Sequence, residues 1–255
     1  MSVEGGKIHI RTSAACSGQG IAQMVTTITC ETIGCPVSGT IYERPFTDRT
    51  PNAGTSTASR QTLLTGEATR QAAAKLKEAL EAAGGDLAKL EGREYYGEFG
   101  PPTDPMGSPK EFPVSHVGYS YGCEVAIIDG KGELRKMVGA YDLGTPINIQ
   151  AVEGQIEGGC VMGLGYALTE YFNNEGGIPK FRLGTYGLFR ANRVPEIETH
   201  IVKGPGYVDH AYGARGVGEL ACVPIAPAVA HAYFRLDGKM RTALPMEDTY
   251  YRKAK

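Results

Sequence analysis

The sequence predicts an α+β fold made of two mixed α/β modules. Strand-like and helix-like segments alternate as β-α-β-α over roughly residues 5–90, which gives the first module. A long β-hairpin, an apolar glycine-rich segment with helical spacing and a last helix follow further along the chain. We therefore divide the chain into a first module at 1–90, an irregular crossing segment rich in Pro and Gly at 91–113, and a second module at 114–255.

The first module opens with an alternating pattern that predicts a strand over residues 7–13. A helix is predicted after the turn Ser17-Gly18-Gln19-Gly20, because apolar residues recur at helical spacing from Ile21 onward. Gly34 marks the expected end of that helix, since glycine readily takes the left-handed conformation found after helix C-termini.

A second strand is predicted over residues 37–42, and a polar, turn-rich stretch separates it from a long helix. This helix should run from about Ser59 to Ala83 and end at Gly84-Gly85. Its predicted buried stripe consists of Ala68, Ala72, Leu76, Leu80 and Ala83.

The second module begins with a hairpin, whose first strand starts at Val114 and whose second strand covers 133–141. The turn between them is Asp129-Gly130-Lys131-Gly132. On the first strand, one face is predicted to carry Val117, Tyr119, Tyr121, Cys123, Val125 and Ile127.

An apolar segment over 152–172 contains several glycines in helical register. Each interior glycine costs a helix about 0.5–1 kcal/mol relative to alanine, so their number implies that something packs against the helix backbone. Tight packing against another element and contact with a ligand both explain them. A last helix is predicted to begin at Pro224 and Pro227, because proline is tolerated in the first helical turn, and to reach about Phe234.

Composition excludes several classes of function. The chain has 255 residues and a formal net charge of -2, which gives no electrostatic reason to bind nucleic acid or an anionic membrane. We expect a cytoplasmic protein, since neither a signal segment nor a membrane span is recognisable. Six scattered cysteines without a C-x-x-C pair, and histidines without an H-x-x-x-H pair, argue against a zinc or iron–sulfur site in this chain. Motifs of serine hydrolases, phosphate-binding loops and dinucleotide folds are absent from the sequence.

One carboxylate, Glu219, ends the glycine-punctuated stretch Gly216-Val217-Gly218-Glu219. It lies shortly before the last predicted helix and among Val, Leu, Ala and Cys, so we expect it to be partly desolvated. An ionised but poorly solvated carboxylate suits a general base. The alternative is an acid that only caps the helix, and spacing alone favours that alternative.

Five short motifs, each weak alone, occur in a fixed order. They are Gly18-Gln19-Gly20, Thr57-Ala58-Ser59-Arg60, Asp142-Leu143-Gly144 with Asn148, Gly154-Gln155-Ile156-Glu157-Gly158-Gly159 with Met162-Gly163-Leu164-Gly165, and Gly216-Val217-Gly218-Glu219. Together they resemble the C-terminal part of the molybdenum-binding subunit of the xanthine dehydrogenase/aldehyde oxidase family. Pro113 to Val117 and Leu244-Pro245 most resemble the bacterial purine and nicotinate hydroxylase branch.

The resemblance implies a molybdenum–pterin cofactor, usually a molybdopterin cytosine dinucleotide in bacteria. It also implies hydroxylation of an electron-poor carbon, in which a glutamate takes the proton of the metal hydroxyl and hydride passes to a sulfido or selenido ligand. Glu219 occupies the place of that glutamate, behind Gly218. Gln155 corresponds to a glutamine at the pterin, and Gln19 with Gly20 to a cofactor-contacting turn. Thr57, Ala58 and Ser59 correspond to a loop whose backbone approaches the metal and the phosphates.

The family pattern also predicts what this chain lacks. The N-terminal half of the usual molybdenum subunit has no counterpart here, which leaves a naturally split subunit, an excised fragment or a paralogue that has lost activity. We expect the first of these, with a partner chain that carries the other half. Iron–sulfur clusters and FAD are expected on further partner subunits. The expected substrate is a purine or other N-heterocycle, with an aldehyde as the first alternative and a non-catalytic orphan domain as the second. Ile149 stands where the family usually has proline, which should cause only a local change.

Overall fold

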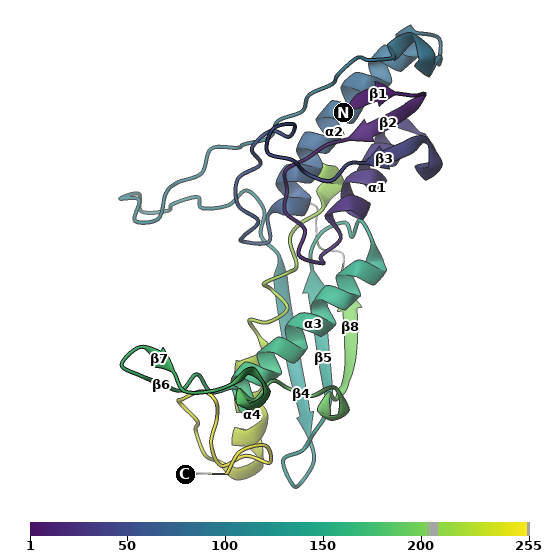
Figure 1. The fold of residues 1–255 in the computed structure, drawn as a ribbon. Coiled ribbons are helices and arrows are strands. Elements are labelled where there is room, and N and C mark those ends of the chain that lie inside the picture. Colours follow the sequence, from purple (N-terminus) through teal and green to yellow (C-terminus); the bar gives the residue numbers. More distant parts are fainter. Residues whose placement is uncertain (203, 205–208, 254–255) are drawn as a thin grey trace. The chain divides into compact units, whose positions relative to one another are not determined.

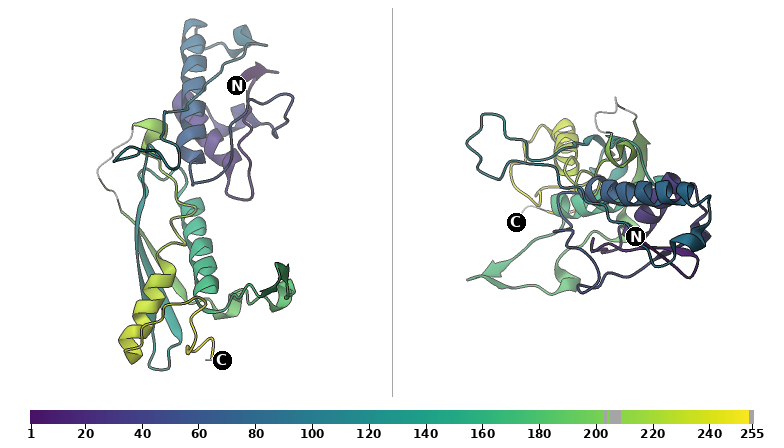
Figure 2. Two further views of the ribbon diagram at one scale, coloured as in Figure 1. Left: turned by 90° about the vertical axis from the view of Figure 1, so that its left-hand side faces the viewer. Right: turned by 90° about the horizontal axis from the view of Figure 1, so that it is seen from above.

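Figures 1 and 2 show the chain as a computed structural model, which describes residues 1–202, 204 and 209–253. Contacts divide the chain into two compact units. The first unit comprises Met1–Tyr119, Leu143–Ala151 and Lys203–Gly216, and the second comprises Ser120–Asp142, Val152–Val202 and Val217–Lys255. Both units combine helices with a sheet, which confirms the predicted α+β class.

The unit boundaries differ from the expected division at residues 91–113. The segment 91–113 lies in the first unit, and so do two later segments that we had assigned to the second module. These segments belong to the first unit because Ile147 packs against its core and Ala211 N–H donates to Glu67 Oε2 at 2.8 Å. They also pair with each other: Gly144 forms an isolated β-bridge with Ala214, and Arg215 N donates to Leu143 O at 3.0 Å.

The first unit holds a three-stranded sheet and two helices. Its strands lie in the order β1-β2-β3, with β1 antiparallel to β2 and β2 parallel to β3. Helix α1 connects β2 to β3. The elements are β1 (Ser2–Glu4), β2 (Lys7–Ile10), α1 (Ile21–Ile33), β3 (Thr40–Tyr42) and α2 (Gln61–Ala82), with short 3₁₀ turns at Val37–Gly39, Leu87–Leu90 and His210–Gly213.

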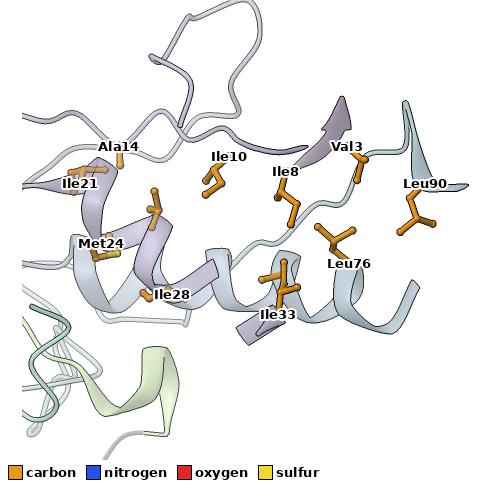
Figure 3. Close-up of a cluster of buried hydrophobic side chains, with 12 residues drawn as sticks. Val3, Ile8, Ile10, Ala14, Ile21, Met24, Ile28, Ile33, Leu76 and Leu90 are labelled. Carbon is orange, nitrogen blue, oxygen red and sulfur yellow. The ribbon is translucent and has the colours of Figure 1, made fainter. Parts of the chain in front are cut away.

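The core of the first unit lies between this sheet and the two helices (Figure 3). Val3, Ile8 and Ile10 point from the strands toward the helices. Leu76 of α2 is fully buried there, which confirms the centre of the predicted stripe. Burial of one such side chain contributes about 1.5–3 kcal/mol, so the packing of the apolar stripe, more than helix propensity, holds α2 in place.

Both helices of the first unit end just before the glycines that were predicted to terminate them. Gly34 adopts the left-handed conformation after α1 (φ 83°) and its N–H donates to Cys30 O. Gly84 and Gly85, also left-handed, follow α2. The start of α2 is a correction: the helix begins at Gln61, because Ala58 and Ser59 have φ values of 54° and 49°, outside the right-handed helical region.

The second unit holds a sheet in the order β4-β5-β8, with β4 antiparallel to β5 and β5 parallel to β8. The predicted hairpin is therefore present, although its first strand begins at Tyr121 and not at Val114. The elements are β4 (Tyr121–Ile128), β5 (Leu134–Asp142), α3 (Ile149–Leu168), the small hairpin β6 (Asn174–Glu175) and β7 (Ile178–Pro179), 3₁₀ turns at Leu183–Thr185 and Ala191–Arg193, β8 (Glu196–Ile201) and α4 (Ile225–Asp237). Helix α4 starts directly after Pro224, as predicted, and ends at Gly238.

Among the described residues, helices cover one face of this sheet and leave the other exposed. Met137 packs with Leu164 of α3 and Val229 of α4 in a buried cluster on that face. The other face carries the stripe predicted for β4, and its side chains are exposed: Tyr121 by 62%, Val125 by 54% and Ile127 by 45%. Within the described residues, no helix is long and apolar enough to cross a membrane.

An ion-pair network ties the strands of the first unit together. Arg11 donates to Glu43 through Nε at 2.7 Å and to Glu4 through Nη2 at 2.6 Å, and His9 Nδ1 lies 2.7 Å from Glu43. Chiefly because of the hydrogen bond from Arg11, the pKa of Glu43 falls from 4.5 to about 2. The ion pair between Arg11 and Glu43 is partly shielded from solvent, since the Glu43 side chain is only 19% exposed.

We predict that Glu43→Gln lowers the free energy of unfolding at pH 7 by about 1 kcal/mol. Because the pKa of Glu43 is depressed on folding, its contribution is complete above the unfolded value of 4.5 and is lost as the pH falls toward 2. Urea unfolding at several pH values should show the difference between wild type and variant closing over that interval. A difference that stays constant down to pH 2 would contradict this assignment.

Candidate functional site

The turn around Gln19 is held by its own side chain. Gln19 Oε1 accepts from the Ser17 N–H at 2.6 Å, and Gln19 Nε2 donates to Ala15 O at 2.8 Å. Gly18 and Gly20 have positive φ values of 116° and 87°, which only glycine adopts readily. The side chain of Gln19 thus shapes the loop, and one of its two amide hydrogens stays outside these bonds.

The amides of this turn create a local preference for negative charge. Hydrogen bonds from the backbone N–H groups of Gly18 and Ile21 lower the pKa of the exposed Cys16 thiol. No side chain caps α1 at Gly20. Converging N–H groups at a helix N-terminus stabilise an anion, whether a thiolate or a phosphate.

The loop before α2 has an unusual backbone. Ala58 and Ser59 are both left-handed, which costs a non-glycine residue about 1–3 kcal/mol. Arg60 steadies the loop, because its Nε and Nη2 donate to Thr55 O at 3.0 and 2.7 Å. Thr57 is exposed, whereas Ala58 and Ser59 are half-buried. Such strain is retained where a fixed backbone direction is needed.

The Gln19 turn and the loop before α2 lie side by side in the first unit. Ser56 Oγ donates at 3.2 Å to Ala15 O, the same carbonyl that accepts from Gln19. Ser13 bridges the loops a second time, since its Oγ accepts from Ala53 N–H at 2.8 Å and donates to Pro51 O. Two motifs about 40 residues apart in sequence (Gln19 and Ser59 in the printed chain) therefore form one structural feature.

Gly216 joins this feature from the far end of the chain. A Cβ atom at Gly216 would collide with the Ser59 carbonyl oxygen and lie 2.6 Å from Ser59 Cβ. No larger residue fits at position 216 without moving the Ser59 loop. The first glycine of the Gly-Val-Gly-Glu motif is thus explained by contact with the loop before α2.

Gly218 and Glu219 belong to the second unit, where they begin a hydrogen-bonded turn that leads into α4. Cys222 N donates to Glu219 O at 3.2 Å within this turn. Glu219 is exposed, which corrects the expectation that neighbouring apolar residues of this chain would desolvate it. The turn separates Glu219 from α4, so the carboxylate does not cap that helix either.

A different carboxylate in the second unit is desolvated. Glu124 on β4 accepts a hydrogen bond from Tyr141 Oη, and burial raises the pKa of Glu124. Its Oε2 is buried and has no hydrogen-bond partner among the described residues. Glu124 was not predictable as a buried carboxylate, because an alternating strand pattern does not show which face of the strand the helices cover.

Gln155 lies in the first half of α3 and is half-buried. Its amide makes no hydrogen bond to other described residues, so it is available to a ligand. Asn148 precedes the helix, and its Oδ1 accepts from Ala151 N–H at 3.0 Å. This cap starts α3 at Ile149, which shows that isoleucine in place of proline leaves the helix start intact.

The glycines of α3 differ in what lies in front of them, and close packing explains Gly159 and Gly163. Cβ atoms at Gly159 and Gly163 would lie 2.6 Å from the Cβ atoms of Ala221 and Ile225, so these two permit close packing against the segment that follows Glu219. Gly154 and Gly158 have open space in front of them. They line a cavity of about 570 Å³ together with Glu157, Val161, Phe189, Ala191, Val194, Pro195 and Ile197.

Neighbouring alanine substitutions test this division. We predict that Gly159→Ala destabilises the chain by about 1–3 kcal/mol, because the new methyl group meets Ala221 and the backbone at Cys222. Gly158→Ala should stabilise α3 by about 0.5–1 kcal/mol, since the new methyl group meets nothing and alanine favours the helix. Thermal and urea unfolding of both variants give the comparison. Equal effects of the two substitutions would refute the packing role of Gly159.

A separate cavity of about 480 Å³ lies in the first unit. It is bordered by α2, the 49–54 loop and the 94–100 segment. Arg49, Arg60 and Asn52 supply hydrogen-bond donors to its lining, while Glu94 and Glu98 contribute opposite charge. Arg60 connects this cavity to the Ala58–Ser59 loop. A cavity of this size accommodates a group as large as a nucleotide.

The features of the first unit fit a flat, phosphate-bearing cofactor. The Gln19 turn offers converging backbone N–H groups, and Gly18, Gly20 and Gly216 remove side chains where backbones approach closely. Gln155 offers an amide that is not used elsewhere among the described residues. Gln19, Gly20, Thr57, Ala58 and Ser59 lie in the first unit, and Gln155, Gly218 and Glu219 in the second.

Comparison with known proteins identifies the family. The model of the molybdopterin cofactor-binding domain matches residues 3–95 and 86–195, which is most of the chain. The chain belongs to this family. It is the molybdopterin-binding type of domain found in the xanthine dehydrogenase/aldehyde oxidoreductase enzymes, as its motifs indicated.

Relatives of this domain are molybdenum oxidoreductases. The xanthine dehydrogenase molybdenum-binding subunit of Escherichia coli O157:H7 is 26% identical over 94% of this chain and 37% of the relative. The aldehyde oxidoreductase of Megalodesulfovibrio gigas is 31% identical over 79% of this chain and 23% of the relative. A solved structure of the aldehyde oxidoreductase from Desulfovibrio gigas matches with a TM-score of 0.81 and 26% identity, covering 96% of this chain and 29% of that one. The chain thus spans between 23% and 37% of the length of these proteins.

Proposed function

We propose that this chain is the base-bearing part of a molybdenum hydroxylase that oxidises a purine or another N-heterocycle at an electron-poor carbon. The observation that carries the proposal is the junction of the Gln19 turn, the Ala58–Ser59 loop and Gly216. These three motifs come from distant parts of the sequence and meet in one unit, through side-chain hydrogen bonds to Ala15 O and through the close approach of Gly216 to the Ser59 backbone. Family membership supports the proposal that each of these segments contacts the cofactor.

When bound, the molybdenum–pterin cofactor supplies the two-electron redox centre and the water-derived oxygen for the reaction. The residues of this chain bind that group and move a proton. Gln19 and Gln155 offer amide hydrogen bonds, and the N–H groups of the Gly18–Ile21 turn favour a phosphate. Glu219 is the group of this chain that would accept a proton, at an oxygen of its carboxylate.

The exposure of Glu219 is consistent with a pocket that another polypeptide completes. A carboxylate works best as a base when water is excluded around it, and this chain does not exclude it. The exposed apolar face of β4 also supports a partner chain, because soluble proteins rarely expose a row of large apolar side chains. We therefore propose a partner chain that carries the remaining part of the molybdenum subunit, with iron–sulfur and FAD subunits beyond it.

The proton-transfer role predicts a specific loss in the complex purified from its native source. Glu219→Gln should lower kcat about 100-fold or more while molybdenum content per chain stays unchanged, because the amide keeps the shape but cannot accept the proton. Glu175→Gln, an exposed glutamate on β6 of the same unit, is the matched control and should leave turnover unchanged. Full turnover by a molybdenum-loaded Glu219→Gln complex would eliminate Glu219 as the base.

We also propose that the cofactor is the cytosine dinucleotide form, with its nucleotide in the 480 Å³ cavity beside Arg49 and Arg60. Acid hydrolysis of the purified complex should then release CMP in about equal amounts to molybdenum, measured by chromatography and elemental analysis. Arg49→Ala should lower both amounts together, because it removes a cation from the cavity. Molybdenum without CMP would show a cofactor that has no cytosine nucleotide.

An aldehyde is the second candidate substrate, and the 31% identity to an aldehyde oxidoreductase favours it. The two candidates share the cofactor and the base and differ only in the oxidised carbon. Assays of one purified complex with hypoxanthine, nicotinate and an aldehyde separate them. A complex that binds molybdenum but oxidises none of these classes would support a non-catalytic domain.

A further inference from the structure

Residues 211–216 directly precede Val217, Gly218 and Glu219 in the chain. We call this segment the stem. It belongs to the first unit, and two of its residues have unusual backbones. Ala211 (φ 48°) and Tyr212 (φ 59°) are both left-handed, although neither is glycine. Two consecutive left-handed residues persist only where neighbouring groups hold them.

Glu67 of α2 holds this pair. Glu67 Oε2 accepts a hydrogen bond from Ala211 N–H at 2.8 Å, across 144 residues of sequence. The Glu67 side chain is only 3% exposed and is itself clamped by Arg70, whose Nε and Nη2 donate to Oε2 and Oε1 at 2.7 and 2.9 Å. Burial acts to raise the pKa of Glu67, but the hydrogen bonds from Arg70, Ala211 and Gln71 more than offset this, so the pKa is lowered and the group stays ionised.

Neighbouring groups complete the seat for the stem. A Cβ at Gly66 would lie 3.3 Å from Ala211 Cβ, so the glycine leaves room for the fully buried Ala211. Tyr212 Oη lies 2.9 Å from Thr32 Oγ1 of α1, and the Arg70 guanidinium lies 5.9 Å from the Tyr212 ring. The left-handed pair is therefore fixed by groups on both helices of the first unit.

We propose that Glu67 is a positioning residue for the loop that carries Glu219. Its carboxylate, oriented by Arg70, fixes the left-handed Ala211–Tyr212 pair and so sets the direction in which the chain enters Gly216-Val217-Gly218-Glu219. Glu67 itself does not react. The inference rests on the proposed role of Glu219 as the base, but its structural part concerns the stem alone.

A purely structural ion pair would not need this arrangement. Glu67 and Arg70 are three residues apart on one helix, and such pairs normally stay on the solvent side. Burying the carboxylate is unfavourable unless its remaining lone pairs are hydrogen-bonded. Ala211 N–H supplies one of those bonds, which couples the buried carboxylate to the stem.

The test compares Glu67→Gln with Glu78→Gln, an exposed glutamate on the same helix, in the complete purified complex. Hydrogen–deuterium exchange should become about tenfold faster in peptides from 209–219 of Glu67→Gln, with α1 and α2 peptides unchanged. Its kcat should fall about 10–100-fold at unchanged KM, because the base is misplaced while substrate binding is kept. Glu78→Gln should match wild type in both measurements.

Unchanged exchange over 209–219 in Glu67→Gln would overturn the proposal whatever happens to turnover. Faster exchange over 209–219, combined with full activity of a Glu219→Gln complex, would have a different meaning. It would support the contact between Glu67 and the stem but rule out Glu219 as the base. If Glu67→Gln does not fold, Arg70→Lys gives the same test, because lysine keeps the charge but loses the two-pronged contact. It should speed exchange in the same peptides, and no change there would equally overturn the proposal.

Discussion

The contact between Gly216 and the Ser59 backbone is the constraint on which the first unit depends. It brings a residue from near the C-terminus against a loop that follows β3, and it leaves no room for a side chain at position 216. Ser59 is itself left-handed and lies against Gly216, so the Ser59 loop cannot shift toward position 216 without breaking this close contact. Because the Gln19 turn is bonded to the same loop through Ala15 O, three motifs share one backbone arrangement.

That arrangement is stabilised by groups outside the motifs. The strain of Ala58 and Ser59 is offset by Arg60, which bonds back to Thr55. The strain of Ala211 and Tyr212 is offset by Glu67 and Thr32. Arg60 directly precedes α2, and Glu67 and Thr32 lie on α2 and α1. In both places these side chains fix a loop whose own residues would prefer another conformation, as is typical of sites that must be preorganised.

Local signals in the sequence predicted local structure well. Gly34 ends α1 and Pro224 precedes α4, since each acts through its own backbone preferences. The motifs and their family were recognisable because five short patterns occur in order. Contacts between distant segments were not predictable: nothing near Glu67 signals that its partner is Ala211, 144 residues away. Glu67 and Arg70 do suggest a helical ion pair, but not a buried one.

The sequence also did not predict which surfaces other parts of the chain would bury. The β4 pattern identifies a stripe of apolar residues, yet alternation cannot show that α3 and α4 would cover the opposite face. The same limit applies to Glu219, whose apolar neighbours in sequence do not bury it. The β4 stripe and Glu219 are both exposed in this chain. We propose that a second polypeptide covers them in the assembled enzyme.

The central claim is that the Gln19 turn and the Ala58–Ser59 loop form a single cofactor cradle in the first unit. The most direct measurement is the hydrogen–deuterium exchange footprint of the purified complex before and after release of its molybdenum cofactor. The account predicts that peptides covering 15–20 and 56–60 lose protection together when the cofactor leaves. A footprint that leaves both of these segments unchanged would contradict it.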